Sequence, residues 1–474
     1  MSLDHPEENA TTSSRESEVN VSGLGKDIGI AQNATNSQEA TESQTTTSDQ
    51  PNTFQNALAQ FWQRLRSPEL LEDENNGPVV IMGTSYTGNL TLPEIEHAIQ
   101  RRLWFTYRTG FEPIPRALDG PSPLSFLGSM IVHGVSPQGA LTGFFDNNSF
   151  KSDVGWGCMI RTAQCLLANT LQTVLVRAAI AEGNTPDWLA INSQVVALFQ
   201  DSYSSPFSLH NFVGVASHLP LKVKPGQWFG PSAASLSIKR LCTKANEDSG
   251  STVSVVPRLN VMICESCDLH DDEIKTALKE LSPLLLLFPI RLGIETINSI
   301  YYPSLFQLLS LPNSMGISGG KPSSSYYFFG YQGELLLYLD PHSSQQVDET
   351  NGSYKPLSCN TVPISGLDPS MVVGLLVESY DDYKALKTEL QGRNKIVHFH
   401  DRAPARRSVS HSTYERSTET ERKGETAGDL SDFVDIGDDF GSEEEGPEDT
   451  SHSMAAKYDI VEGPSKVTVL EDEN

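Results

Sequence analysis

Cysteine is scarce in this sequence. Its 474 residues contain six cysteines, unevenly spaced, at positions 158, 165, 242, 264, 267 and 359. Small secreted domains that rely on disulfides carry cysteine at much higher density. The composition therefore argues against a disulfide scaffold and predicts reduced thiols.

Basic residues are also few. The chain has 34 lysines and arginines against 60 aspartates and glutamates, which gives a formal net charge of −26. Proteins that bind nucleic acid or anionic lipid electrostatically need basic surfaces, so we expect no nucleic-acid partner. Much of the negative charge lies near the C-terminus, where residues 429–449 contain ten carboxylates and no lysine or arginine.

Long apolar runs are missing as well. The longest, residues 284–290, is far shorter than the roughly 18 residues that indicate a membrane span. The first residues are polar and acidic, whereas a secretory signal has a basic region followed by an apolar one. No glycine-rich fingerprint for phosphate or dinucleotide binding occurs. We therefore expect a soluble, cytoplasmic protein.

Composition divides the chain into three parts. Residues 1–51 are rich in Ser, Thr, Asn, Gln and Glu, and residues 401–474 change from Arg, Ser and Thr to acidic blocks. Such segments bury too little apolar surface to offset the entropy of ordering, so we predict two disordered tails. Residues 52–400 contain aromatic and aliphatic residues throughout, which predicts one large domain with a small inserted subdomain.

The middle part mixes helical and strand patterns. Apolar spacing of three and four predicts helices at residues 92–107, 158–179 and 274–281. A continuous apolar run predicts a buried strand at residues 284–290. Two further runs, residues 326–331 and 335–340, predict a hairpin with its turn at Gln332-Gly333. Because these elements follow no regular βαβ order, the sequence predicts the α+β class.

One cysteine stands at the start of the strongest predicted helix. In residues 155–161 (GWGCMIR), Cys158 follows a glycine-rich turn. A helix N-terminus has unpaired N–H groups and the positive end of the helix dipole, and both favour a thiolate. Gly155 and Gly157 permit close backbone approach, and Trp156 could wall a site. The alternative is a core thiol, since cysteine is among the most buried residue types.

A base and an orienting carboxylate follow a predicted apolar strand. Residues two apart on an extended chain project to the same side, so Asp340 and His342 could face one cleft. The carboxylate would fix the tautomer of the ring and stabilise its charged form. A strand exit is the alternative, because Asp-Pro is common in turns. With Cys158, the pair completes the nucleophile, base and orienter of a thiol hydrolase.

Several segments, in this order, resemble the autophagins, the autophagy-related cysteine proteases that process and delipidate a ubiquitin-like modifier. They are residues 102–108 (RLWFTYR), 152–164 (SDVGWGCMIRTAQ), 226–231 (GQWFGP), 316–331 (GISGGKPSSSYYFFGY) and 338–342 (YLDPH). The resemblance implies a papain-like fold in which Cys158 is the nucleophile, His342 the general base and then acid, and Asp340 the orienter. It also implies that Tyr107 donates a hydrogen bond to the oxyanion, beside the backbone N–H of Cys158. An ordinary buried tyrosine is the alternative for Tyr107.

The resemblance further implies a narrow substrate groove. Trp228 and Pro312 align with family elements that clamp this groove and block it until substrate arrives, although ordinary packing would also account for each. Such a groove suits an extended peptide with small side chains and cleavage after glycine.

One site of this kind would perform two reactions, because the glycine carbonyl forms an amide with either a following residue or phosphatidylethanolamine. The implied partners are the modifier precursor and its lipid conjugate, which would bring the enzyme to autophagosomal membranes. No cofactor and no metal is implied.

The acidic tail contains a short candidate binding motif. Residues 432–436 (DFVDI) place Phe433 and Ile436 among carboxylates, and such a peptide can add as a β-strand to a partner with two pockets and a basic rim. This resembles the motif that binds the same modifier, although chance matches are frequent in such tails. Residues 62–65 (WQRL) fit the bare pattern but have basic neighbours.

Three other features have plain alternatives. Cys264 and Cys267 form a single CxxC pair, which is too little for a zinc site and leaves redox regulation open. His398 and His400 could suggest a metal site, but alternation at a strand end is simpler. Thr162 stands where some family members carry an additional cysteine, so oxidative control through that position is in doubt.

Two other function classes stay open from the sequence. A catalytically inactive protein could hold the modifier through its groove and tail, although the intact set of Cys158, Asp340 and His342 argues against it. A deubiquitinase-like or transglutaminase-like thiol enzyme would share these three residues but not the glycine-selective groove. A parallel cleavage assay on ubiquitin and the autophagy modifier separates these alternatives.

Overall fold

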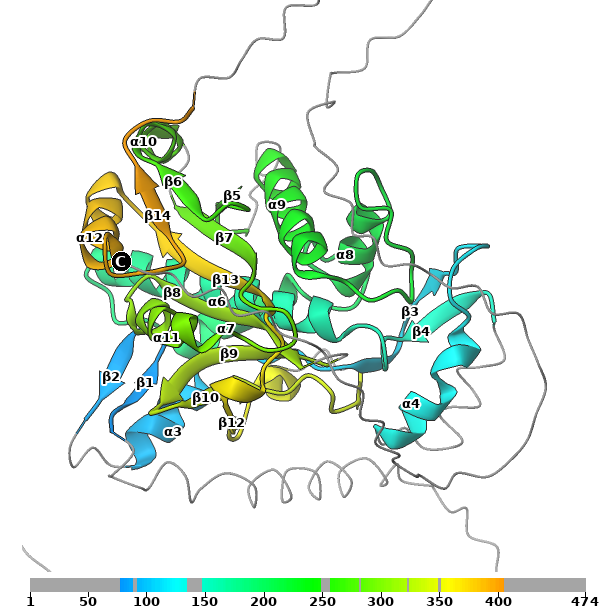
Figure 1. Cartoon of the computed structure of the whole chain (residues 1–474). Coiled ribbons are helices and arrows are strands. Elements are labelled where there is room, and N and C mark those ends of the chain that lie inside the picture. The colour runs from blue at the N-terminus through cyan, green and yellow to red at the C-terminus, as the bar shows by residue number, and fades with distance from the viewer. Residues whose placement is uncertain are drawn as a thin grey trace, which may run out of the picture. The chain divides into compact units, whose positions relative to one another are not determined.

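The computed structural model describes most of the middle of the chain. The described residues are 77–87, 92–133, 147–248, 256–280, 283–321, 324–347 and 351–404 (Figure 1). The predicted N-terminal tail, the pattern at residues 62–65, and Phe433 and Ile436 lie outside the described residues. In the described part of the chain, no helix combines the length and the apolar character needed to cross a membrane.

A mixed β-sheet forms the centre of the fold. Its strands run in the order β12-β10-β9-β8-β13-β7-β5, and β1 pairs with both β9 and β2. Only β5 and β7 are parallel among these pairs. The bounds are β1 Val79–Ile81, β2 Thr84–Tyr86, β5 Asn260–Ile263, β7 Leu284–Arg291, β8 Ser314–Lys321, β9 Ser324–Gln332, β10 Leu335–Leu339, β12 Asn360–Pro363 and β13 Ser370–Val377.

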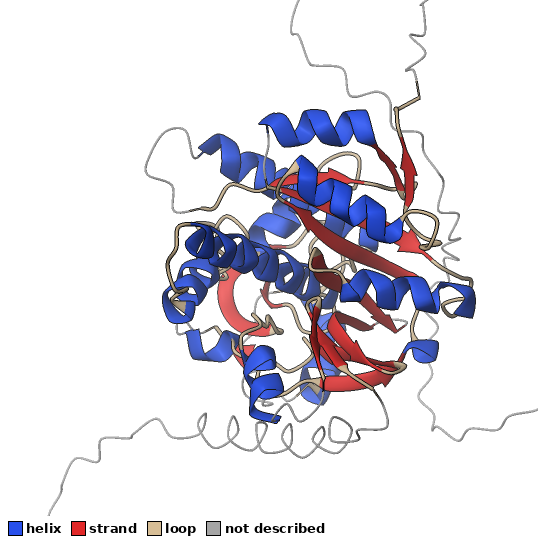
Figure 2. Cartoon of the chain, turned by 90° about the vertical axis from the view of Figure 1, so that its left-hand side faces the viewer, coloured by secondary structure: helices blue, strands red, loops and turns tan. Residues whose placement is uncertain are grey.

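Helices cover both faces of the sheet (Figure 2). One face packs against α6 Cys158–Ala181, α7 Trp188–Ala197, α8 Leu209–Ala216 and α9 Pro231–Asp248. The other packs against α10 Asp271–Glu280, α11 Tyr302–Ser310 and α12 Tyr380–Leu390. Short 3₁₀ turns occur at Pro123–Phe126, Ser299–Tyr301, Asn351–Tyr354 and Ile364–Gly366.

The strand side chains alternate between two cores. On β7, Leu285 and Leu287 lie in the core beneath α6, whereas Leu284, Leu286 and Phe288 lie in the core beneath α11 and α12. Successive residues of a strand point to opposite faces, so a strand covered on both sides must be apolar at every position. This explains the unbroken apolar run of β7.

Most predicted elements are confirmed. Helix 158–179 is α6, and the hairpin is β9 and β10, in which Gln332 pairs with Leu335. The helix predicted from residue 274 is α10, which begins three residues earlier at Asp271. The mixture of helices with a largely antiparallel sheet confirms the α+β class.

The helix predicted over residues 92–107 is too long. In the structure α3 covers Leu92–Gln100 and ends there. Three backbone N–H groups that would continue it bond elsewhere: Leu103 to Asn169 Oδ1 at 3.1 Å, Trp104 to the Tyr354 carbonyl at 2.9 Å and Phe105 to Cys165 Sγ at 3.2 Å. These contacts with α6 and a distant loop replace the helical hydrogen bonds.

A second, small sheet brings three sequence regions together. Its strands β3 Arg108–Pro115, β4 Ser149–Ser152 and β11 Gln345–Gln346 run in the order β11-β3-β4. β3 starts directly after Tyr107, β4 ends six residues before Cys158, and β11 starts three residues after His342. Pairing of these strands therefore fixes the backbone on both sides of the predicted catalytic residues.

The C-terminal end of the described region is a third, two-stranded sheet. β14 His398–His400 pairs in parallel with β6 Asp268–His270. The Ala403 N–H donates to Asp272 Oδ1 at 3.0 Å. The described residues continue to residue 404, and residues 405–474, most of the predicted acidic tail, lie outside them.

Candidate active site

Cys158 is the first residue of α6. It is 7% exposed, and the N-cap, Gly157, supplies no side-chain hydrogen bond to the helix. A helix N-terminus and its dipole favour a thiolate at this position. A side chain at position 157 would collide with the Asp153 carboxylate, and Gly155 has a φ of +89°. Both glycines are required by this turn, as the sequence predicted.

His342 and Asp340 form a short hydrogen-bonded pair in the loop after β10. Asp340 Oδ1 lies 2.6 Å from His342 Nδ1 and also accepts the backbone N–H of His342 at 2.9 Å. The carboxylate therefore holds the proton on Nδ1 and directs Nε2 away from it. The indole of Trp104 donates to the Asp340 carbonyl at 2.9 Å, which anchors the loop.

The fold brings Cys158 and His342 into side-chain contact. Burial acts to raise the pKa of Cys158, but hydrogen bonding and charge from His342, the Ser325 backbone and the Tyr107 hydroxyl outweigh it, so the pKa lies below its usual value. Burial acts to lower the pKa of His342, and its bonds to Asp340 and Cys158 raise it to about 9. Each group favours the charged form of the other.

The contact between thiol and imidazole is not yet well aligned. Within the described residues, His342 Nε2 is buried and no hydrogen bond of good geometry satisfies it. Catalytic hydrogen bonds are often long or misaligned before substrate binds. Nε2 is thus the ring nitrogen available to exchange a proton with the sulfur.

Tyr107 lies against the same thiol. Its side chain is buried, and burial, together with the neighbouring Cys158, raises the pKa of the phenol far above its usual value. The hydroxyl therefore stays protonated and can donate a hydrogen bond. Its backbone is held by bonds to the Pro341 carbonyl at 2.8 Å and from the Gln345 N–H at 3.0 Å. Tyr107 thus presents a protonated hydroxyl beside the Cys158 thiol.

A buried ion-pair network supports the turn before Cys158. Asp153 Oδ2 bonds to Arg161 Nε at 2.7 Å, and Arg161 Nη1 bonds to Asp201 at 2.9 Å. Asp153 also accepts the backbone N–H of Arg108 through Oδ1 at 2.6 Å and that of Gly157 through its carbonyl at 2.9 Å. Asp153 thus joins β3 and α6 through its carboxylate and the glycine turn through its backbone carbonyl. The sequence analysis missed this network, although a charged residue inside an apolar helix was a signal for it.

Aromatic rings surround His342, and two of them, from Tyr326 and His133, were not singled out in the sequence analysis. The rings of Tyr107 and Tyr326 meet it edge-on, each at a centroid distance of 5.4 Å. His133 lies nearly parallel to it at 5.8 Å. Only 13% of the His342 side chain is exposed. No local pattern in the sequence indicates these contacts.

Thr162 lies one turn after Cys158 on the buried face of α6. Its hydroxyl is 2.6 Å from Ser318 Oγ and 2.7 Å from Ser325 Oγ. Since Ser325 also bonds to Cys158 through its backbone, Thr162 helps to hold β8 and β9 against the start of α6.

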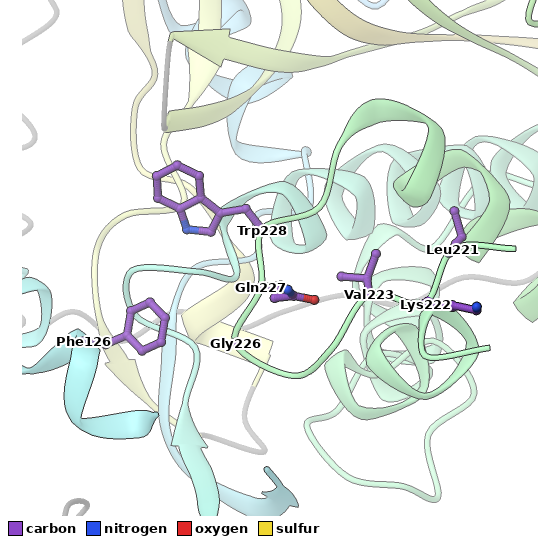
Figure 3. A pocket seen from close by; sticks show the side chains of 7 residues that line it. All are labelled: Phe126, Leu221, Lys222, Val223, Gly226, Gln227 and Trp228. Atoms are coloured by element: carbon purple, nitrogen blue, oxygen red, sulfur yellow. The ribbon is translucent and has the colours of Figure 1, made fainter. Parts of the chain in front are cut away.

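Trp228 borders a groove beside the glycine turn. Its indole N–H donates to the Gly155 carbonyl at 2.7 Å, yet 55% of the residue is exposed. The groove has a volume of about 550 Å³. Figure 3 shows its lining side chains, which come from Phe126, Leu221, Lys222, Val223, Gly226, Gln227 and Trp228. Trp228 is thus held against the turn that precedes Cys158.

Pro312 is not brought to this groove. Its carbonyl accepts a hydrogen bond from Arg177 at 2.7 Å, and Arg177 follows Cys158 by 19 residues on α6, a distance of about 28 Å along the helix. Pro312 precedes β8, whereas the far end of β8 pairs with Ser325 beside the thiol. The structure therefore brings Pro312 to the C-terminal half of α6 and not to the groove bordered by Trp228.

Trp156 is a core residue and not a wall of the groove. It is fully buried, donates from its indole to the Ser152 carbonyl at 3.0 Å and packs on Phe150 with ring centroids 5.4 Å apart. The exposed indole of Trp228 borders the groove instead.

The CxxC pair and the C-terminal histidines lie in the third sheet and the turn before it. Burial raises the pKa of Cys264 to about 12 and that of Cys267 to about 11. His398 and His400 belong to β14, and His400 Nε2 lies 2.8 Å from Asp268 Oδ1. Within the described residues, no cluster of His, Cys, Asp and Glu is arranged to hold a metal ion.

Comparison with known proteins gives a consistent family assignment. The peptidase C54 catalytic domain matches residues 92–389. A probable cysteine protease ATG4 from Meyerozyma guilliermondii is 46% identical over 408 residues, covering 84% of this chain and 90% of the relative. The cysteine protease ATG4 of Candida albicans is 49% identical over 310 residues, covering 64% of this chain and 66% of the relative.

These matches agree with the site geometry. The family domain spans more than half of the chain, and its peptidases have the papain-like fold that the sequence predicted. A buried thiol at a helix N-terminus, in contact with an Asp-paired histidine, is the arrangement a thiol peptidase requires. The chain belongs to the peptidase C54 family, the autophagins, and is a cysteine peptidase.

Proposed function

We propose that this peptidase cleaves after the C-terminal glycine of a ubiquitin-like autophagy modifier, with Cys158 as its nucleophile. The observation that carries the proposal is the contact between Cys158, which begins α6, and the Asp340-paired imidazole of His342. The relatives named ATG4 support an autophagy substrate for this site.

The reaction would proceed through a thioester. The Cys158 thiolate attacks the glycine carbonyl, and the negative charge that develops on its oxygen meets the backbone N–H of Cys158 and the Tyr107 hydroxyl. His342 gives its Nε2 proton to the departing amine as the C–N bond breaks. It then takes a proton from water, which hydrolyses the thioester and regenerates the thiol.

The groove bordered by Trp228 would hold the peptide that leads to the scissile bond. The Trp228 indole is hydrogen-bonded to the Gly155 carbonyl, and Gly155 is three residues from the proposed nucleophile. Phe126 faces the groove from the neighbouring segment (Figure 3). We expect an extended tail with small residues at the bond to fit between these walls.

The same mechanism would release the modifier from phosphatidylethanolamine. The lipid headgroup nitrogen and a peptide nitrogen are both amide leaving groups on the same glycine carbonyl, so His342 protonates either one. The enzyme would then reach autophagosomal membranes through its substrate, with Phe433 and Ile436 as an additional contact to the modifier.

Replacement of Cys158 by alanine tests the proposal. Cys158→Ala should abolish cleavage of purified modifier precursor and keep modifier binding, whereas Cys242→Ala, which removes another buried thiol on α9, should cleave normally. Ubiquitin with a C-terminal extension serves as the alternative substrate. Turnover by Cys158→Ala, or preference for the ubiquitin fusion, would reject the assignment.

A further inference from the structure

We propose that His133 is a positioning residue that covers one face of the His342 imidazole and restrains the orientation of this ring beside Cys158. The inference rests on the proposed role of His342 as general base and acid. His133 directly follows α4, Leu127–Val132, in the segment between β3 and β4.

The ring geometry carries the inference. His133 and His342 lie with their planes 28° apart and their centroids 5.8 Å apart. Tyr107 meets both rings edge-on, at 5.7 Å from His133 and 5.4 Å from His342. Three rings thus form one packed group at the thiol, and loss of the His133 ring would leave one face of His342 open to water.

The segment that carries His133 is anchored to the glycine turn. The His133 N–H bonds to the Ser129 carbonyl at 2.9 Å. Ser129 and Phe126 pack against Gly155 so closely that a side chain at position 155 would overlap both. His133 is therefore held relative to Cys158 by the same short segment that provides a wall of the substrate groove.

The charges around His342 determine what titration of His133 would do. His342 is faced by Asp340 from its own loop, and by four groups from other elements: Cys158 on α6, Tyr107 before β3, Tyr326 on β9, and His133. Burial and the charge of His342 lower the pKa of His133, and Asp340 partly opposes this. His133 is therefore mostly neutral at neutral pH, where His342, with a pKa raised to about 9, is charged. At acidic pH a second cation would form next to the imidazolium and repel it.

Two substitutions of His133 separate a role in positioning His342 from a role in the stability of the fold. His133→Ala removes the covering ring and should lower kcat about tenfold with KM within about twofold, because small displacements of a catalytic group are costly. His133→Phe keeps an aromatic face without titrating and should restore most of this loss. His97→Phe, on an exposed position of α3, is the matched control.

The pH profile gives a readout that a structural role would not change. We would measure alkylation of Cys158 by iodoacetamide, by peptide mass spectrometry on the full chain, and cleavage of modifier precursor, both between acidic and neutral pH. In His133→Phe the acid limb of kcat should become less steep and move lower by about half a pH unit.

These measurements test the role of His133 independently of the proposed substrate and nucleophile. Unchanged kcat and acid limbs in both variants, or equal losses in both, would overturn the role of His133. Alkylation requires no modifier, so it tests His133 even if the assigned substrate is wrong, whereas turnover by Cys158→Ala would reject the catalytic assignment itself.

Discussion

Two regions of this protein each combine a buried cysteine with an Asp–His pair. At the start of α6, Cys158 contacts His342, whose Nδ1 lies 2.6 Å from Asp340. At the third sheet, Cys267 precedes Asp268, whose Oδ1 lies 2.8 Å from His400 Nε2. The residue types are the same, yet the pKa of Cys158 is lowered and that of Cys267 is raised to about 11.

The order of the groups explains the difference. Burial raises the pKa of both thiols. At Cys158 the imidazole stands between carboxylate and sulfur and presents a positive charge to the thiolate. At Cys267 the nearest ionised group is the Asp268 carboxylate itself, which repels a thiolate. A reactive cysteine thus depends on which end of an Asp–His pair it meets.

Among the changes that test this difference between the two cysteines, removal of the Asp340 charge should reduce activity the most. In Asp340→Asn the imidazolium loses its main stabilising bond, so the pKa of His342 should fall from about 9 and the alkaline limb of activity should move to lower pH. We expect kcat/KM for modifier precursor to fall about 10²- to 10³-fold, because a wrongly oriented ring is a poor base.

Asp268→Asn is the matched control for Asp340→Asn, because it removes the carboxylate of the other Asp–His pair. Its activity and alkaline limb should match those of the wild type. An unchanged alkaline limb in Asp340→Asn would contradict the role assigned to that carboxylate.

A smaller loss should follow removal of the Tyr107 hydroxyl. Tyr107→Phe keeps the ring packing on His342 but removes one donor to the oxyanion, and the backbone N–H of Cys158 remains. We expect kcat to fall about 10- to 100-fold. Iodoacetamide alkylation of Cys158 forms no oxyanion and should fall much less, because the hydroxyl is the last named of the groups that lower the pKa of the thiol. An equal fall in alkylation and kcat would assign Tyr107 to thiolate stabilisation alone.

The candidate nucleophile and base could be found from the sequence because their signals are local. Apolar spacing identifies α6, and the two-residue spacing of Asp340 and His342 places both groups at one strand end. The structure adds that the 183 residues between Cys158 and His342 fold so that the two side chains meet.

Contacts between distant segments could not be predicted in this way. His133 reaches His342 from a segment 209 positions away, and Arg161 joins Asp153 to Asp201 in the interior. These residues have no shared spacing or motif, because their proximity depends on how whole elements pack. The incorrect extension of α3 has a related cause, since a buried extended segment and a buried helix are both apolar.

Comparison of the two assigned groove residues gives the next prediction. Trp228 bonds to Gly155 beside the nucleophile, whereas Pro312 lies at the other end of α6. Trp228→Ala should raise KM for modifier precursor about fivefold to tenfold, by loss of a buried aromatic contact with the peptide. Pro312→Ala should leave KM unchanged. The reverse result in steady-state kinetics would restore Pro312 to the groove.

The smallest expected effect concerns the acidic tail, for which we propose modifier binding and no part in the chemistry at Cys158. Replacement of both Phe433 and Ile436 by alanine removes the two apolar anchors of the candidate motif and keeps its carboxylates. Because such strand-like motifs add affinity at a second site, we expect calorimetry to show about threefold to tenfold weaker modifier binding. Cys158 alkylation should not change, since the thiol and its base are untouched.

The matched variant Trp62→Ala with Leu65→Ala alters the other pattern match and should bind like the wild type. Equal affinity of all three proteins would confine modifier recognition to the groove, whereas slower alkylation in the tail variant would place the tail at the active site.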